Sequence, residues 1–282
     1  MPVLRVKSLI LVFLLTGMAA QAEDPGLVQR ALANEARAAN DAQHLMRYRL
    51  RKSSPRLTTT KEICETTDGA VARLIAVNDA PLSAADEQRE QMRLDQLLND
   101  PGRQRHRKQG QDQDTARAMK VLRSLPRAFV YEYAGVGPGP SGQVAKFRFR
   151  PNPRFDPPDL ETQVLKQMTG ELWIDPRQER VAKLDGRLQQ DVDIGWGILG
   201  RLYKGGTIVI DQADVGEGQW RIVHFDMKMS ARVVFKIRVF DTTEDESQFV
   251  PVPAGLRYQQ AIALLRDTRT SSTRNRSEFA GK

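Results

Sequence analysis

The sequence predicts an α+β protein with an antiparallel sheet that is apolar on one face and polar on the other. Two observations carry this prediction. From residue 128 onward, apolar and polar side chains alternate with a period of two, which is typical of half-buried strands. The segment 26–40 instead has helical spacing, with apolar residues at Val28, Leu32, Ala36 and Ala39.

The segment that follows this helix predicts the first strands of the sheet. Tyr48 and Leu50 alternate with arginines, and residues 57–65 are rich in threonine and isoleucine. A turn at residues 66–69 precedes a returning strand at 71–77. We therefore expect three strands here.

A charged helical insertion is expected at about residues 83–125. Ser83 suits the N-cap of a helix that runs to about residue 99, and a second helix is expected from about 115 to 125, ending at Pro126. Between them lies a basic run that contains Arg103, Arg105 and Arg107. These arginines predict either a solvated surface or a contact with an anionic headgroup or an acidic partner.

The later strands are expected in hairpins. Residues 129–133 and 145–149 alternate around a glycine- and proline-rich stretch, and residues 169–175 and 181–188 form a second pair. The glycine-rich stretch, 135–142, follows a strand as a phosphate loop would. However, a strand and not a helix follows it, so we interpret it as a hairpin connection.

The strongest alternation lies between residues 223 and 239. A turn at 230–232 would place the apolar residues before and after it on one sheet face. That face predicts either ordinary core against helices or an adaptable site for acyl chains. Its residues are Phe225, Met227, Met229, Val233, Phe235 and Ile237, with Phe147 and Trp173 as possible neighbours.

No catalytic or metal-binding pattern stands out. His44, His106 and His224 lie far apart in the sequence, and Cys64, the single cysteine, is expected to be buried and inert. Carboxylate pairs such as Asp156 and Asp159 exist, but their separation in space is not set by sequence. We expect no enzyme, no metal and no cofactor.

The amino terminus has the pattern of a cleavable secretory signal peptide. Arg5 and Lys7 precede an apolar run, and residues 20–22 form an Ala-x-Ala site with cleavage expected after Ala22. The remaining chain holds 41 basic and 35 acidic residues, too weak a charge excess for a nucleic-acid binder. The carboxyl terminus, 267–282, is expected to be a disordered basic tail.

Two local motifs resemble a known family. Residues 170–175 read Gly-Glu-Leu-Trp-Ile-Asp and are followed by Val-Ala-Lys-Leu at 181–184, and long strands run from Trp220 to Val239. Together with the order of elements, these resemble the LolA/LolB-like periplasmic lipoprotein carriers and the related amino-terminal domain of RseB. The resemblance implies an incomplete antiparallel β-barrel over residues 23–266, with helices covering its concave face, that holds acyl chains without a cofactor.

On that resemblance we expect a non-enzymatic periplasmic carrier or sensor for a lipid, lipoprotein or other amphiphile. Its partners would be acyl chains, envelope membrane proteins and, transiently, a membrane surface, but not nucleic acid. Two other hypotheses remain open at this point. The protein could be a stress sensor or scaffold that binds other proteins, or a secreted hydrolase that uses a carboxylate.

Overall fold

The computed structural model describes residues 24, 26–39, 41, 43–194, 200–233 and 236–267. The expected signal peptide at 1–22, Phe235 and the tail beyond Asp267 lie outside the described residues. The glycine-rich segment 195–199 also lies outside them.

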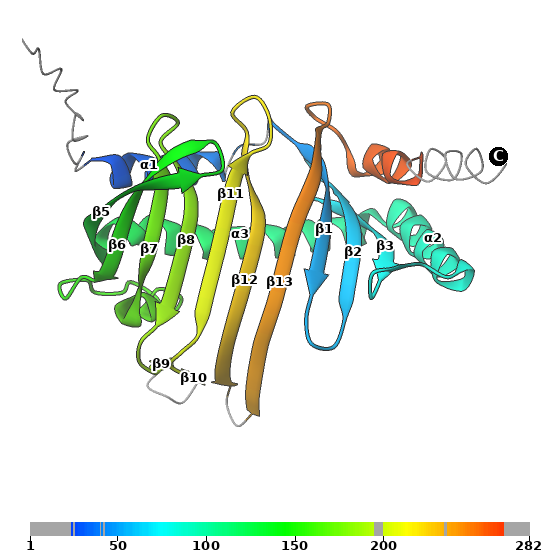
Figure 1. Cartoon of the computed structure of the whole chain (residues 1–282). Helices are drawn as coiled ribbons and strands as arrows, with labels where there is room; N and C mark the ends of the chain where they lie inside the picture. The colour runs from blue at the N-terminus through cyan, green and yellow to red at the C-terminus, as the bar shows by residue number, and fades with distance from the viewer. Residues whose placement is uncertain are drawn as a thin grey trace, which may run out of the picture.

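One antiparallel sheet dominates the described chain (Figure 1). Its strand order is β4-β3-β2-β1-β13-β12-β11-β8-β7-β6-β5, and the short strands β9 and β10 extend it beside β12. Because β4 and β5 at the two edges do not pair with each other, the sheet stays open. The strands are β1 (Met46–Ser53), β2 (Thr58–Cys64), β3 (Val71–Val77), β4 (Ala80–Pro81), β5 (Phe129–Gly139), β6 (Gly142–Pro151), β7 (Met168–Asp175), β8 (Arg180–Leu188), β9 (Val192–Ile194), β10 (Gly200–Leu202), β11 (Thr207–Asp214), β12 (Trp220–Val233) and β13 (Lys236–Pro251). The predicted fold class, α+β with an incomplete antiparallel barrel, is confirmed.

The helices are α1 (Leu27–Ala38), α2 (Ala84–Asn99) and α3 (Pro101–Ala128), with a 3-10 turn η1 (Gln163–Gln167) and a further helix over 258–267. The prediction was wrong for α3, which begins well before residue 115 and includes the basic run. Asp100 caps its first turn by accepting a hydrogen bond from the backbone N–H of Arg103, and Pro101 needs no partner at that position. Pro126 lies in the last turn rather than ending the helix.

Two apolar cores lie at opposite ends of the sheet. The first, which we call the β5–β8 core, joins α1 and the end of α3 to strands β5 to β8. Its most buried members are Ala31, Ala128, Leu172 and Ile174. The second packs α2 and the helix at 258–267 against the ends of β2 and β3, and it contains Cys64, which is fully buried as predicted. Burial raises the pKa of the Cys64 thiol to about 11.

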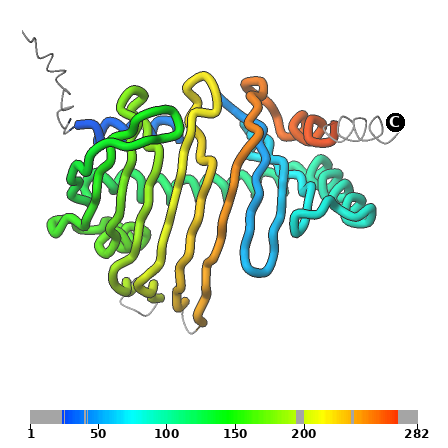
Figure 2. Tube along the Cα trace, in the orientation of Figure 1, coloured from blue at the N-terminus to red at the C-terminus, as the bar shows by residue number. Residues whose placement is uncertain are grey.

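Helix α3 connects these two ends. At its start, the Gln104 amide donates to the carbonyls of Asp68 and Gly69 in the β2–β3 turn, and at its end Leu125 lies in the β5–β8 core. Figure 2 shows α3 running behind the central strands between these ends. Gln104 and Leu125 are about 32 Å apart along a helix, whereas the eight strand spacings from β3 to β6 cover about 38 Å. The sheet must therefore curve around the helix.

The turn between β12 and β13 lies later than predicted. Strand β12 continues through residues 230–232 to Val233, which pairs with Lys236 at the start of β13. Residues 231–233 pair with β13 on one side and with β10 on the other. Because both backbone edges of this segment are hydrogen-bonded in the sheet, it continues as a strand instead of turning.

Candidate functional site

The side chains of the sheet divide into two faces. We call the face that packs on α1 and the end of α3 the inner face. Leu172 belongs to it because it lies in the β5–β8 core. Leu172 pairs with Leu184, Leu184 with Ile210, and Ile210 with Phe225. Since paired residues on neighbouring strands point to the same side, all four side chains share the inner face.

A continuous apolar surface follows from this register on strands β11 to β13. Met227 pairs with Ile208, and Met229 pairs with Phe240. We call this surface the central inner strip. None of its side chains is fully buried, and Phe240 is 40% exposed. The strip consists of Ile208, Ile210, Phe225, Met227, Met229 and Phe240.

The helix that crosses the sheet offers the strip no apolar partner. Residues 102–118 of α3 include no large apolar side chain, and none of residues 105–118 is buried. A helix that is polar on every side cannot bury an apolar sheet face. The central inner strip is therefore apolar, half-buried and uncovered by α3, whereas the β5–β8 core is closed by apolar residues of α1 and α3.

Polar groups border the strip on the β13–β1 side. On the same face, Glu244 pairs with Phe225 in register and its carboxylate lies 2.6 Å from the Lys52 ammonium. Glu246 lies two residues further along β13, on the same face. Burial, together with the nearby charges of Glu244 and Glu65, raises the pKa of Glu246 to about 8. An apolar surface thus meets a charged and titratable one, which is an arrangement that suits an amphiphile.

The structure brings together only some of the residues that were predicted to line the apolar face. Phe225, Met227 and Met229 form the middle of the strip, while Phe147 lies in the β5–β8 core at 4% exposure. Val233 shares the inner face at the far end of β12 and is 45% exposed.

Ile237 does not join this set. It pairs with Arg232, whose position on β12 alternates with those of Met229 and Val233, so Ile237 points to the outer face. The physical reason is the pairing of Val233 with Lys236, which leaves two residues between the strands instead of the expected three. Changing that number by one reverses the face of each side chain that follows. Phe235 lies outside the described residues.

Trp173 also points away from the inner face. It follows Leu172 in β7, and its ring lies against the ammonium groups of Lys146 and Lys183, 3.8 Å and 5.6 Å from the ring centre. It packs with a separate small cluster of Val144, Ala182 and Trp220. Trp173 is therefore not a neighbour of the strip. Its ring takes part in cation–π contacts, and its indole N–H donates a hydrogen bond to the Glu171 carboxylate.

The three arginines of the basic run do not converge. Arg103 and Arg107 lie one turn apart on α3, whereas Arg105 points to the opposite side of the helix. Burial and the neighbouring charges of Arg93 and Arg103 lower the pKa of Arg107. The guanidinium of Arg103 donates to Gln96. Only Arg103 and Arg107 could therefore meet one anion together.

Sequence reasoning missed Ile208, Ile210 and Phe240 as members of the strip. The inner residues of the strand that contains Ile208 and Ile210 could be assigned only once its pairing with β12 was known. Phe240 follows an apolar residue, Val239, so alternation alone did not set its face.

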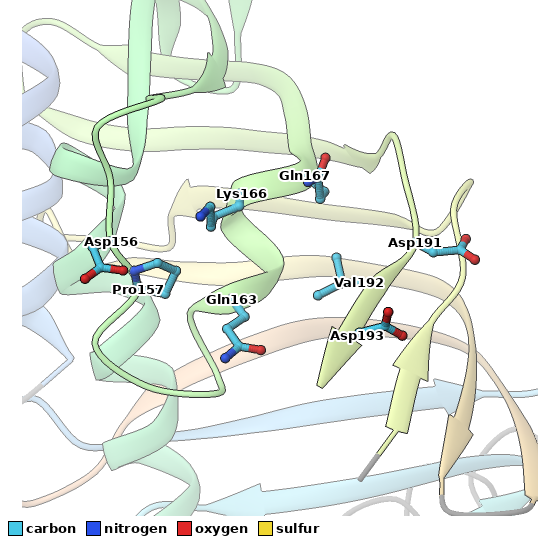
Figure 3. Close-up of a pocket in the computed structure, with 8 residues that line it drawn as sticks. All are labelled: Asp156, Pro157, Gln163, Lys166, Gln167, Asp191, Val192 and Asp193. Carbon is cyan, nitrogen blue, oxygen red and sulfur yellow. The ribbon is translucent and has the colours of Figure 1, made fainter. Parts of the chain in front are cut away.

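A pocket lies at the rim of the sheet, between η1 and β9 (Figure 3). Its volume is about 380 Å³ and its lining is mainly polar: Asp156, Pro157, Gln163, Lys166, Gln167, Asp191, Val192 and Asp193. The guanidinium of Arg201 lies 2.6 Å from the Asp193 carboxylate. This pocket does not match an acyl-chain site.

The carboxylates of Asp156 and Asp159 have separate surroundings. Asp156 lines the rim pocket, whereas Asp159 accepts hydrogen bonds from the backbone N–H and the hydroxyl of Thr162 and so supports the turn before η1. Among the described residues, no group of three or more His, Cys, Asp or Glu side chains is placed to hold a metal ion. No helix in the described part is long and apolar enough to cross a membrane.

Neither a protein-family model nor a curated protein matches the sequence. Among solved structures, the chain is similar to a protein from Vibrio parahaemolyticus described as an outer membrane lipoprotein-sorting protein domain. The similarity covers 82% of this chain and 95% of that chain, with 10% sequence identity and a TM-score of 0.32.

Proposed function

We propose that this protein is a non-enzymatic periplasmic carrier or sensor that binds the acyl chains of a lipid, lipoprotein or other amphiphile on the central inner strip. The observation that supports this proposal is the mismatch between the strip and α3. An exposed apolar surface is unfavourable in water by about 25 cal/mol per Å², and here α3, the helix that crosses the sheet, lacks the apolar residues to cover it. An acyl chain would supply the missing apolar partner.

The side chains of the strip suit a ligand of variable shape. Met227 and Met229 are flexible and polarisable, and such residues adapt to acyl chains of different length and curvature. The other side chains of the strip on β11 and β12, those of Ile208, Ile210 and Phe225, are less flexible than the two methionines. Binding would require no covalent step, only burial of apolar surface.

The charged border gives the ligand an orientation. A polar headgroup would lie toward β13 and β1, near Lys52 and the carboxyls of Glu244 and Glu246. The acyl part would then point toward β11 and β8. Because Glu246 holds its proton near neutral pH, it could donate a hydrogen bond to a headgroup oxygen.

The test compares inner-face residues of β11 and β12 with an outer-face residue of β11. Ile210→Gln combined with Met227→Gln makes the strip polar, while the control Val209→Gln changes the next residue of β11, which pairs with Asp226 and Asp185 on the outer face. Titration with a fluorescent fatty acid should show affinity about tenfold lower or weaker for the double variant, from the lost apolar burial. The control should stay within about twofold of the wild type.

Native mass spectrometry of the purified protein, followed by solvent extraction, would identify any ligand already bound. An empty protein that also fails to take up the probe would contradict the proposal. So would equal probe binding by the double variant and the wild type. Turnover of an ester that is abolished by one Asp or Glu substitution would instead support the hydrolase hypothesis.

A further inference from the structure

On its β13 side, the β12–β13 hairpin extends beyond the neighbouring strand. Strand β1 ends at Ser53, which pairs with Thr243, so the part of β13 from Lys236 to Thr242 pairs only with β12 among the described strands. In Figure 1 the lower ends of β12 and β13 reach past the β1–β2 hairpin. We call residues 233 and 236–240 the hairpin end.

The hairpin end exposes apolar side chains on both of its faces. On the outer face, Ile237 and Val239 are 68% and 71% exposed. On the inner face, Val233 and Phe240 are 45% and 40% exposed. Apolar side chains so exposed on two opposite sides of one element are not explained by packing within the chain. They indicate that an apolar environment would contact both faces of the hairpin end.

Basic side chains alternate with these apolar ones. The sequence from Met227 to Phe240 contains Lys228, Arg232, Lys236 and Arg238 and no acidic residue. Lys228, Lys236 and Arg238 are exposed, and none of these three forms an ion pair within the described part of the chain. In contrast, the same strand turns acidic further on, from Asp241 to Glu246. Within β13, the positive charge is thus confined to the part that lies beyond β1.

We infer that the hairpin end docks this protein on an anionic membrane surface, with its apolar side chains in the interface and its cations on lipid phosphates. A folded protein partner would cover one face of a hairpin, whereas a lipid interface surrounds both. Anionic headgroups match Lys236 and Arg238, the exposed basic residues of the hairpin end, because such a surface attracts nearby Lys and Arg side chains. This contact goes beyond the proposed ligand site and does not require it.

The test is co-sedimentation of the purified protein with vesicles. One set contains phosphatidylcholine alone and the other contains phosphatidylcholine with phosphatidylglycerol. Two double variants address the two features of the hairpin end: Ile237→Ser with Val239→Ser, and Lys236→Gln with Arg238→Gln. Matched controls remove exposed apolar residues elsewhere, Val136→Ser with Ile222→Ser, and exposed charges elsewhere, Arg123→Gln with Arg148→Gln.

The wild type should bind the anionic vesicles, with much weaker binding to phosphatidylcholine alone. Each hairpin variant should lose about tenfold or more of that affinity, and the controls should change it by less than about threefold. Far-ultraviolet circular dichroism confirms that each variant is folded. Fatty-acid binding in solution should be unchanged in the hairpin variants, which separates this contact from the proposed ligand site.

Four results would overturn the inference. The wild type could fail to bind anionic vesicles, or the hairpin variants could bind as well as the controls. Vesicle binding that is lost only when Arg103 and Arg107 become glutamine would place the contact on α3 instead. Self-association of the wild type that the hairpin variants abolish, without vesicle binding, would assign the hairpin end to pairing between proteins.

Discussion

The β5–β8 end of the sheet and the central strands β11 to β13 carry the same kind of inner face but differ in what covers it. At the β5–β8 end, Phe147 and Leu172 are buried under apolar residues of α1 and α3. At the centre, Phe225 and Met227 are only half-buried. The difference comes from the helix, since α3 is apolar where it ends and polar where it crosses the centre. Burial of a sheet face is thus decided by its partner as much as by the strands.

The largest expected contrast is between two phenylalanines of the inner face. Phe147→Ala should reduce the free energy of unfolding by about 3–5 kcal/mol, because a cavity opens in a closed core. Phe225→Ala should reduce it by about 1–2 kcal/mol, because its side chain already contacts solvent. Urea unfolding followed by tryptophan fluorescence measures both. Equal losses would mean that the centre is packed as tightly as the β5–β8 core.

The second contrast concerns pH, because the central face contains a carboxyl that is protonated near neutrality. The pKa of Glu246 is raised in the folded chain to about 8, above its ordinary value of 4.5. Between these two values the unfolded chain releases this proton more readily, so stability should fall as pH rises from about 4.5 to 8 and then level off. Each unit of such a shift corresponds to about 1.4 kcal/mol.

Glu246→Gln should remove this part of the pH dependence and stabilise the chain by about 2 kcal/mol at pH 8.5, less than the full shift because neighbouring side chains relax. Thermal unfolding between pH 5 and pH 9 measures the effect. Glu217→Gln, in the exposed turn between β11 and β12, is the control. A variant whose stability changes with pH as the wild type does would show that Glu246 ionises normally.

The smallest effect should come from giving α3 the apolar surface that it lacks. Thr115 and Ala118 lie on the side of α3 that carries Gln111 and Leu122, which are partly buried. Changing both to leucine should stabilise the chain by about 1 kcal/mol and weaken fatty-acid binding, since the helix would compete for the strip.

The control for this change is the opposite side of the same helix. Gln113→Leu with Ala116→Leu adds similar apolar surface away from the sheet, and it should leave fatty-acid affinity unchanged. Equal effects of the two double variants on affinity would show that α3 does not cross over the central inner strip.

Local patterns in the sequence were enough to predict most of the helices and strands. Alternation predicted the strands around Tyr48, Phe147 and Phe225. The glycine-rich stretch at 135–142 contains the expected hairpin turn, but most of it is strand, since β5 runs to Gly139, which pairs with Gly142 at the start of β6. These predictions succeed because side-chain direction in a strand depends on neighbours in the sequence. The extent of α3 was missed because its middle has no apolar periodicity, and its start depends on the cap at Asp100.

The candidate site needed more than local pattern. The sequence by itself determined that Phe225, Met227 and Met229 share one face of a strand, and that an α+β chain with an open sheet could hold them. Only the tertiary structure decided that Ile237 and Trp173 point to the other face, that Ile208, Ile210 and Phe240 complete the strip, and that a polar helix crosses it. The physical reason is that pairing register and helix placement are set by contacts between residues far apart in the chain, and a turn shorter by one residue reverses the face of the strand that follows.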